Sequence, residues 1–331
     1  MATPKQQRSN PKTVPAPARK PKKSGRPGGR PPGVAPIKKA TLGDWIAGAR
    51  LQTLPLAIMP VALGTATAYT VSYDGAGWHW LRALLCLAVA LLLQIGVNFA
   101  NDYSDGIRGT DKHRAGPRRL TASGAAKPRA VLAVALVFFA LAAIAGLIIV
   151  VRTEHWWLIG VGAAAILAAW FYTGGKRPYG YYGLGEVFVF IFFGLVAAVG
   201  TTFVLAGTVT SDTWYVAVAA GLISCAALMV NNIRDREQDK LAGKRTLAVL
   251  LGDLPSRIAY GVLLLAPFVI LIPFTLIYLN AYLVYFVLLA AIPAVVITLT
   301  AKTAPELVLA LRLTSLVGLA YGLGLGWAIA F

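Results

Sequence analysis

The sequence predicts an all-α integral membrane protein with about nine transmembrane helices. Of its 331 residues, 57% are hydrophobic and only 13% are charged, which is about half the charged share of a typical soluble domain. Apolar runs of about 20 residues, each long enough to cross a bilayer core of about 30 Å, recur along the chain. The basic residues gather in alternate connections between these runs, as they do in multi-pass membrane proteins.

Residues 1–40 form a separate region, rich in Pro, Lys, Arg, Gly and Ser, with almost no large apolar side chain. Such a segment cannot bury enough apolar surface to offset its ordering entropy. We therefore expect a disordered basic tail that precedes one polytopic domain over residues 41–331. The tail's charge suits a cytoplasmic anchor near anionic lipid. Nucleic-acid binding is not expected, because no aromatic residue is interleaved with the basic ones.

Nine apolar segments follow, and the charge of their connections predicts an orientation. Every Lys and Arg except Arg82 and Arg152 falls in the N-terminal region up to residue 50, or in a connection on that same side or at the segment ends that border one. Basic residues concentrate on the cytoplasmic side, so we expect the N-terminus in the cytoplasm and, after nine spans, the C-terminus outside. The expected segments are 44–71, 81–104, 129–151, 155–173, 183–208, 213–233, 256–278, 281–301 and 307–330.

The last segment carries Gly318, Gly322 and Gly326 at four-residue spacing. Small residues at this spacing let two membrane helices approach closely. We expect this stripe to pack against a neighbouring helix. The two cysteines, Cys86 and Cys225, fall inside apolar runs, so no disulfide framework is expected.

Two polar stripes end the second and the sixth segments on the predicted cytoplasmic side. Residues three or four apart share one face of a helix. Asn98, Asp102 and Asp105 therefore form one stripe, and a second stripe consists of Asn231, Asp235 and Asp239. Both segments read Val-Asn-x-x-x-Asp. Ionisable groups at membrane depth are costly and are usually functional, so the repeated pattern predicts a site shared by two helices.

Carboxylates from two facing helices suit a hard cation that takes its remaining ligands from water and phosphate. Magnesium that bridges a diphosphate is the expected occupant. Basic residues around the first stripe include Lys112 and Arg114, and Lys244 lies near the second. The short connection Tyr172-Thr-Gly-Gly-Lys176-Arg177 adds two cations and two glycines. Arginine can bind phosphate oxygens bidentately, although part of this charge is expected to serve topology alone.

These motifs resemble the UbiA superfamily of intramembrane prenyltransferases, over roughly residues 41–331. The resemblance is carried by Arg50-Leu-Gln52-Thr53-Leu-Pro55, by Asn98 through Asp111, by Tyr172 through Arg177, and by Asn231 through Asp239 with Lys244-Arg-Thr-Leu-Ala-Val249. They look most like the branch that prenylates 1,4-dihydroxy-2-naphthoate. One position departs from the general superfamily pattern: residue 109 is Gly where Asp is usual, and the next carboxylate is Asp111. This departure resembles the naphthoate branch.

The resemblance implies a UbiA-like bundle and a defined reaction. A polyprenyl diphosphate would be joined to 1,4-dihydroxy-2-naphthoate, with loss of CO2 and diphosphate, to give demethylmenaquinone in menaquinone biosynthesis. Asp102, Asp235 and Tyr172 would be catalytic, the last by stabilising an allylic cation with its ring. The implied Mg²⁺ ligands are Asn98, Asp102, Asp105, Asp235 and Asp239; the implied diphosphate-binding residues are Lys112, Arg114, Lys176, Arg177 and Asn231; the implied acceptor-binding residues are Arg50 and Gln52.

Two alternatives stay open at this level. A prenyltransferase of the same superfamily with another aromatic acceptor would reuse the diphosphate half of the site. A membrane anion transporter would also suit many spans and a basic face, but alternating-access sites lie near the middle of the membrane, and the acidic residues here sit at helix ends.

Overall fold

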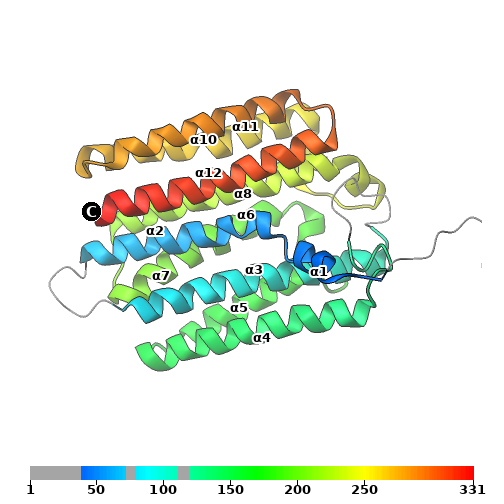
Figure 1. The fold of residues 1–331 in the computed structure, drawn as a ribbon, viewed down its shortest axis with the longest axis horizontal. Coiled ribbons are helices and arrows are strands. Elements are labelled where there is room, and N and C mark those ends of the chain that lie inside the picture. Colours follow the sequence, from blue (N-terminus) through cyan, green and yellow to red (C-terminus); the bar gives the residue numbers. More distant parts are fainter. Residues whose placement is uncertain (1–38, 72–78, 111–118) are drawn as a thin grey trace, which may run out of the picture. The chain divides into compact units, whose positions relative to one another are not determined.

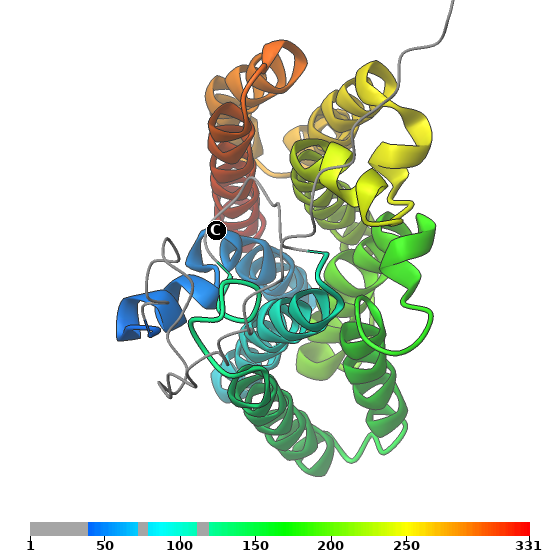
Figure 2. The ribbon, with the colours of Figure 1, turned by 90° about the vertical axis from the view of Figure 1, so that its right-hand side faces the viewer.

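A computed structural model describes residues 39–71, 79–110 and 119–331, and within them it contains helices and no strand. The expected basic tail therefore lies almost wholly outside the described residues. The helices run alongside one another (Figures 1 and 2). They are α1 (Leu42–Gly48), η1 (Leu51–Thr53), α2 (Pro55–Val71), α3 (Trp80–Arg108), α4 (Pro128–Thr153), α5 (Leu158–Phe171), η2 (Tyr179–Tyr182), α6 (Gly185–Val189), η3 (Phe190–Val196), α7 (Ala197–Ala206), α8 (Ser211–Leu241), α9 (Leu247–Leu251), α10 (Asp253–Ile277), η4 (Ala281–Val287), α11 (Leu288–Thr300) and α12 (Ala304–Ala330).

Each of the nine predicted segments folds as one helix or as consecutive helices. In the described part of the chain, seven helices are long and apolar enough to cross a membrane, or up to eight if the bent pair that contains α1 and α2 is counted as one span. The remaining segment is α5, which has only 14 residues. At 1.5 Å per residue it reaches about 21 Å, less than a bilayer core. The multi-pass architecture is thus confirmed, and the count of nine is approximate.

The first predicted span is bent by 46° between Leu42–Thr53 and Pro55–Val71. A capping box of Thr41 and Asp44 starts α1 and satisfies amide groups that have no partner inside the helix. Arg50 then takes a left-handed backbone conformation with a φ of 54°, which breaks the helix. Pro55 starts α2, where its missing N–H costs nothing. The bend places Arg50 and Gln52 in the short connection between α1 and α2.

The two helices that carry the polar stripes continue past their apolar runs. The second segment was predicted to end at 104 and the sixth at 233, but α3 extends to Arg108 and α8 to Leu241. Both end on the side of the bundle where α1 lies, opposite the chain end at Phe331 (Figure 1). Gly109 terminates α3 in a left-handed conformation with a φ of 75°, which an aspartate adopts only with strain. The glycine that departs from the superfamily pattern is thus the residue that ends α3.

The predicted glycine stripe packs as expected. Ideal Cβ atoms on Gly318 and Gly322 would lie 3.4 Å from the Met59 sulfur and 2.8 Å from the Met59 Cγ respectively, and one on Gly326 would lie 3.4 Å from the Ala62 carbonyl oxygen. Helix α12 thus approaches α2 closely along this face, and the two helices form part of the largest buried apolar cluster.

The tightest helix contact predicts a stability effect at Gly64. A Cβ on Gly64 would lie 2.4 Å from the carbonyl oxygen of Ala198, a backbone atom that cannot move without shifting α7 away from α2. We expect Gly64→Ala to destabilise the protein by about 1–3 kcal/mol or more, as overpacking does, and to lower the midpoint of thermal unfolding in detergent. Gly200→Ala is the matched control, because a Cβ there meets no atom within 4 Å. Equal midpoints for the two variants would contradict the close contact.

Candidate active site

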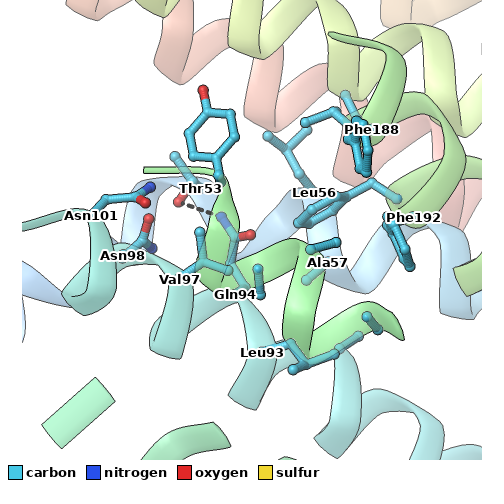
Figure 3. A pocket seen from close by; sticks show the side chains of 18 of the residues that line it. Thr53, Leu56, Ala57, Leu93, Gln94, Val97, Asn98, Asn101, Phe188 and Phe192 are labelled. Atoms are coloured by element: carbon cyan, nitrogen blue, oxygen red, sulfur yellow. Dashed lines mark hydrogen bonds between the residues drawn. The ribbon is translucent and has the colours of Figure 1, made fainter. Parts of the chain in front are cut away.

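One cavity of about 1020 Å³ joins the ends of the two polar stripes to an apolar interior between the helices. Its polar lining includes Asn98, Asp102 and Asp105 from α3, and Asn231, Asp235 and Asp239 from α8. All six residues of the two predicted stripes thus line the same space. Its apolar lining includes Phe188, Phe192, Leu56, Ala57 and Leu93, which Figure 3 shows.

Asp105 links the two stripes. Its carboxylate accepts a hydrogen bond of 2.7 Å from the Tyr181 hydroxyl and one of 3.0 Å from Lys244 Nζ. The same ammonium lies 3.8 Å from the Asp239 carboxylate. Burial opposes the charge on Lys244, but Asp105 and Asp239 outweigh it and raise the lysine pKa. Burial and the nearby Asp105 carboxylate raise the pKa of Tyr181 to about 12, so this hydroxyl stays a donor at neutral pH.

Asp102 has a different environment from Asp105, although the sequence treats the two alike. Its carboxylate oxygens accept hydrogen bonds from the backbone amides of Leu120 and Thr121, at 2.9 and 2.8 Å. The Asp102 side chain is only 1% exposed. Asp102 therefore holds the chain at Leu120 and Thr121 against the end of α3.

The second stripe is also held by specific partners. Arg234 donates through Nε and Nη2 to the two oxygens of Asp235, at 2.8 and 2.7 Å, and both side chains are buried. Next to Asn231, Asn232 donates 3.0 Å to the buried carboxylate of Glu186 at the start of α6. The sequence pattern singled out Asn231, and the structure adds Asn232 to the cavity lining beside it.

The connection after α5 is tied to the end of α3. Thr173 donates a 2.7 Å hydrogen bond to the Asn101 side chain, and the Arg108 guanidinium binds the carbonyl oxygens of Thr173 and Gly175. These contacts place Tyr172 in the cavity wall, with its ring 5.5 Å from that of Tyr179 in an edge-on arrangement. Burial, and next the Glu186 carboxylate, raise the pKa of Tyr172 well above its usual value.

The residues expected to bind the acceptor also line the cavity. Arg50 and Gln52 are part of its wall. Gln94 lies on α3, one turn before Asn98, and donates a 3.2 Å hydrogen bond to the Thr53 hydroxyl, so that these two polar side chains face each other (Figure 3). Gln94 extends the first stripe deeper into the bundle, and sequence reasoning missed it because a single amide in an apolar run breaks no pattern.

The expected diphosphate-binding residues other than Asn231 fall into two groups. Lys112 and Arg114, like Asp111, lie outside the described residues. Lys176 and Arg177 are exposed and do not line the cavity, because the chain turns at Gly175, which has a φ of 75°, and Arg108 holds the turn. In the described residues, the cations that line the cavity are Arg50, Arg119, Arg234, Lys244 and Arg312.

No group of three or more His, Cys, Asp or Glu side chains within 39–71, 79–110 and 119–331 is already arranged as a metal site. The donor set nevertheless fits a hard cation. Carboxylates from two helices converge on one positive charge, the Lys244 ammonium, and carboxylate and amide oxygens are the ligands that magnesium prefers.

Comparison with known proteins places this arrangement in a family. The model of the UbiA prenyltransferase family matches residues 57–314, which include both stripes and most of the cavity wall. This chain belongs to the UbiA prenyltransferase family. The helix ends that bear the two stripes therefore lie within the part of the chain that matches the family.

Relatives within the UbiA family match over most of their length. A "1,4-dihydroxy-2-naphthoate octaprenyltransferase" from Mycobacterium tuberculosis is 45% identical over 88% of this chain and 98% of its own length. A protein of the same name from Mycobacterium leprae is 50% identical over 69% of this chain and 76% of its own. A UbiA homologue from Archaeoglobus fulgidus, solved with GPP and Mg²⁺, shares the fold with a TM-score of 0.58 and 16% identity, over 87% of this chain and 99% of that one.

Proposed function

We propose that this UbiA-family protein transfers a polyprenyl group from polyprenyl diphosphate to 1,4-dihydroxy-2-naphthoate, a step of menaquinone biosynthesis. The observation that carries the proposal is the single cavity, which joins carboxylates from two helices to apolar walls. One end suits a cation and a diphosphate, and the other suits a hydrocarbon chain. The relatives with 45% and 50% identity, both named for this reaction, support the choice of acceptor. They do not favour an anion carrier.

The same residues support a divalent metal, which we take to be Mg²⁺. Asp105 and Asp239 share one cation, and Asp102, Asp235 and Asn98 line the wall beside them. These five residues would hold the metal. When bound, it would neutralise the charge that develops on the departing diphosphate. A homologue of the same fold was solved with Mg²⁺ and a prenyl diphosphate, which is consistent with this assignment.

The cavity residues divide the remaining tasks. Asn231 would orient the diphosphate, and Lys244 and Arg119, which line the cavity, would neutralise its outer oxygens. Lys112 and Arg114 stay candidates for the same task. Breaking the C–O bond leaves an allylic cation, and the ring face of Tyr172 would stabilise it. The raised pKa of Tyr172 keeps its hydroxyl protonated, so this residue contributes its ring and not a negative charge.

The acceptor would enter beside the α1–α2 connection, where Arg50 and Gln52 line the cavity. Its electron-rich ring attacks the allylic carbon through the carbon that bears the carboxylate. The carboxylate then leaves as CO2, and the electron pair of the broken C–C bond restores the aromatic ring. The product is demethylmenaquinone in its quinol form, and no external base is needed for this step.

The protein is a multi-pass membrane protein, and we propose that the site faces the cytoplasm. Both stripes end on the side of the bundle that carries the basic connections, and basic connections are typically cytoplasmic. The same rule would place the N-terminus inside and the C-terminus outside. Cysteine labelling from outside intact cells at an introduced cysteine after Ala330 would test this orientation.

The acceptor can be tested directly. Purified protein is incubated with radiolabelled polyprenyl diphosphate, Mg²⁺ and either 1,4-dihydroxy-2-naphthoate or 4-hydroxybenzoate. We expect a labelled lipid product and released CO2 only with the naphthoate, and no product after chelation of the metal. Product with the benzoate alone would instead support a UbiA-type enzyme with another acceptor, and no product with either would contradict a prenyl transfer to aromatic acids.

Replacements of Tyr172 separate its ring from its hydroxyl. Tyr172→Phe keeps the ring face and should retain most of kcat. Tyr172→Ala removes it and should lower kcat about 30-fold, as expected for loss of about 2 kcal/mol of cation–π stabilisation in a desolvated site. Single-turnover rates with saturating substrates would measure the two effects. A loss in the Phe variant as large as that in the Ala variant would assign the role to the hydroxyl.

A further inference from the structure

Arg312 is a basic residue in the membrane-spanning helix α12, and it belongs to neither polar stripe. It lies eight residues after the start of α12 at Ala304, which is about 12 Å along the helix. An arginine within a membrane-spanning helix is rare and commonly marks a functional site. Its side chain is exposed and lines the cavity, so it faces the space that substrates would occupy.

The contacts of Arg312 leave most of its hydrogen-bonding capacity available. Its Nε donates 3.3 Å to the side-chain oxygen of Gln52, a residue 260 positions earlier in the chain. Within the part of the chain that the structure describes, no ion pair joins Arg312 to a carboxylate. A guanidinium has five N–H donors. The two terminal nitrogens can therefore bind an anionic ligand.

Two other cations of the cavity wall already have acidic partners. Lys244 lies between Asp105 and Asp239, and Arg234 binds Asp235 through two hydrogen bonds. Those pairs belong to the carboxylate cluster, which would receive the metal and the diphosphate. Arg312 differs because its described partner is a neutral amide, and a neutral amide does not balance its charge.

The proposed reaction brings two anions into one cavity. A diphosphate and an aryl carboxylate repel each other there, because like charges are poorly screened at the effective dielectric of a partly buried site. The acceptor carboxylate therefore needs a cation of its own that is not already paired with the Asp cluster.

We propose that Arg312 and Gln52 form the subsite for the acceptor's carboxylate. The guanidinium would bind both carboxylate oxygens, a geometry that arginine favours. Because the Gln52 oxygen accepts from Arg312, its amide nitrogen points elsewhere and can donate to the acceptor. The inference rests on the proposed function. It adds Arg312, which lies outside the Arg50–Pro55 motif, to the predicted acceptor-binding residue Gln52. Arg312 would then help to determine which class of acceptor binds.

The test compares two inhibitors that differ only in the carboxylate. Purified full-length protein is assayed with 1-hydroxy-2-naphthoate and with 1-naphthol as competitors of the acceptor. We expect Arg312→Gln to weaken inhibition by the naphthoate about 10- to 100-fold, the range for a lost hydrogen bond to a charged group. Inhibition by naphthol and the KM for polyprenyl diphosphate should not change. Lys302→Gln, which removes an exposed cation near the start of the same helix, is the control.

A second variant protects the test against a folding defect at Arg312. Gln52→Glu places a carboxylate against the guanidinium, so it should pair with Arg312, repel the ligand carboxylate and weaken the naphthoate alone. Equal weakening of both inhibitors in either variant would overturn the proposal. A raised KM for polyprenyl diphosphate would overturn it too, by assigning Arg312 to the diphosphate.

A lipid phosphate is another anion that could bind Arg312. The inhibitor comparison is therefore repeated in nanodiscs of purely zwitterionic lipid and in nanodiscs with added anionic lipid. The carboxylate subsite predicts the same selective loss in both, whereas a loss confined to anionic lipid would overturn it. If the wild-type protein prenylates 4-hydroxybenzoate and not the naphthoate, the proposed function fails. The subsite can then still be tested separately, because Arg312→Gln should raise the KM for 4-hydroxybenzoate and leave the KM for polyprenyl diphosphate unchanged.

Discussion

Asp105→Asn should reduce prenyl transfer by at least about 10²- to 10³-fold while the protein remains folded. The Asp105 carboxylate is the point where the two stripes meet, because it shares the Lys244 ammonium with Asp239. Asparagine keeps the shape and can still accept one of the two hydrogen bonds from Tyr181 and Lys244. It removes the negative charge that a divalent cation requires. Losing one preorganised electrostatic group at the reacting centre typically costs this much in kcat.

The metal dependence of the variant distinguishes a ligand from a structural residue. Diphosphate should raise the midpoint of thermal unfolding only when Mg²⁺ is present. We expect the Mg²⁺ concentration that gives half of this rise to be higher for Asp105→Asn than for the wild-type protein. Glu237→Gln is the control. Glu237 lies near the end of α8, its side chain is largely exposed, and it forms an ion pair with Arg236. Unchanged metal dependence in Asp105→Asn, together with lost activity, would remove Asp105 from the metal site.

Much of this site could be predicted from the sequence because helical periodicity is a local property. The spacing of Asn98, Asp102 and Asp105 already places them on one face of a helix, and the structure puts them in one cavity with the second stripe. The bend before α2 was not predicted, because an apolar run shows where a bilayer is crossed and not where a helix breaks.

The partners of the stripes could not be predicted, since they come from distant parts of the chain. Tyr181 reaches Asp105 from a connection 76 residues away, and Arg312 reaches Gln52 across 260 residues. No motif spacing encodes such contacts. The placement of Lys176 and Arg177 could not be predicted for a related reason. Their motif placed them near the site in sequence, but the turn at Gly175 exposes both side chains.

Asp102→Ala should lower activity as strongly as Asp105→Asn, because it removes a proposed metal ligand and also loosens the chain beside the cavity. The Asp102 carboxylate accepts the amides of Leu120 and Thr121, and hydrogen bonds to a charged group contribute about 1.5–3 kcal/mol each. Without them, the chain beside the cavity loses its attachment to α3. We expect faster hydrogen exchange at Leu120 and Thr121 and a lower unfolding midpoint, whereas Asp105→Asn should leave exchange at these two amides unchanged.

Asp102→Asn gives the sharper form of this test. The asparagine side chain has one acceptor oxygen, and its NH2 group would face a backbone N–H, so only one of the two amide contacts can survive. Exchange should therefore accelerate at one of Leu120 and Thr121 more than at the other. If both variants lose activity while both amides keep their protection, Asp102 acts on the ligand and not by holding the chain. The two stripe carboxylates would then have the same role, as their spacing in the sequence suggests.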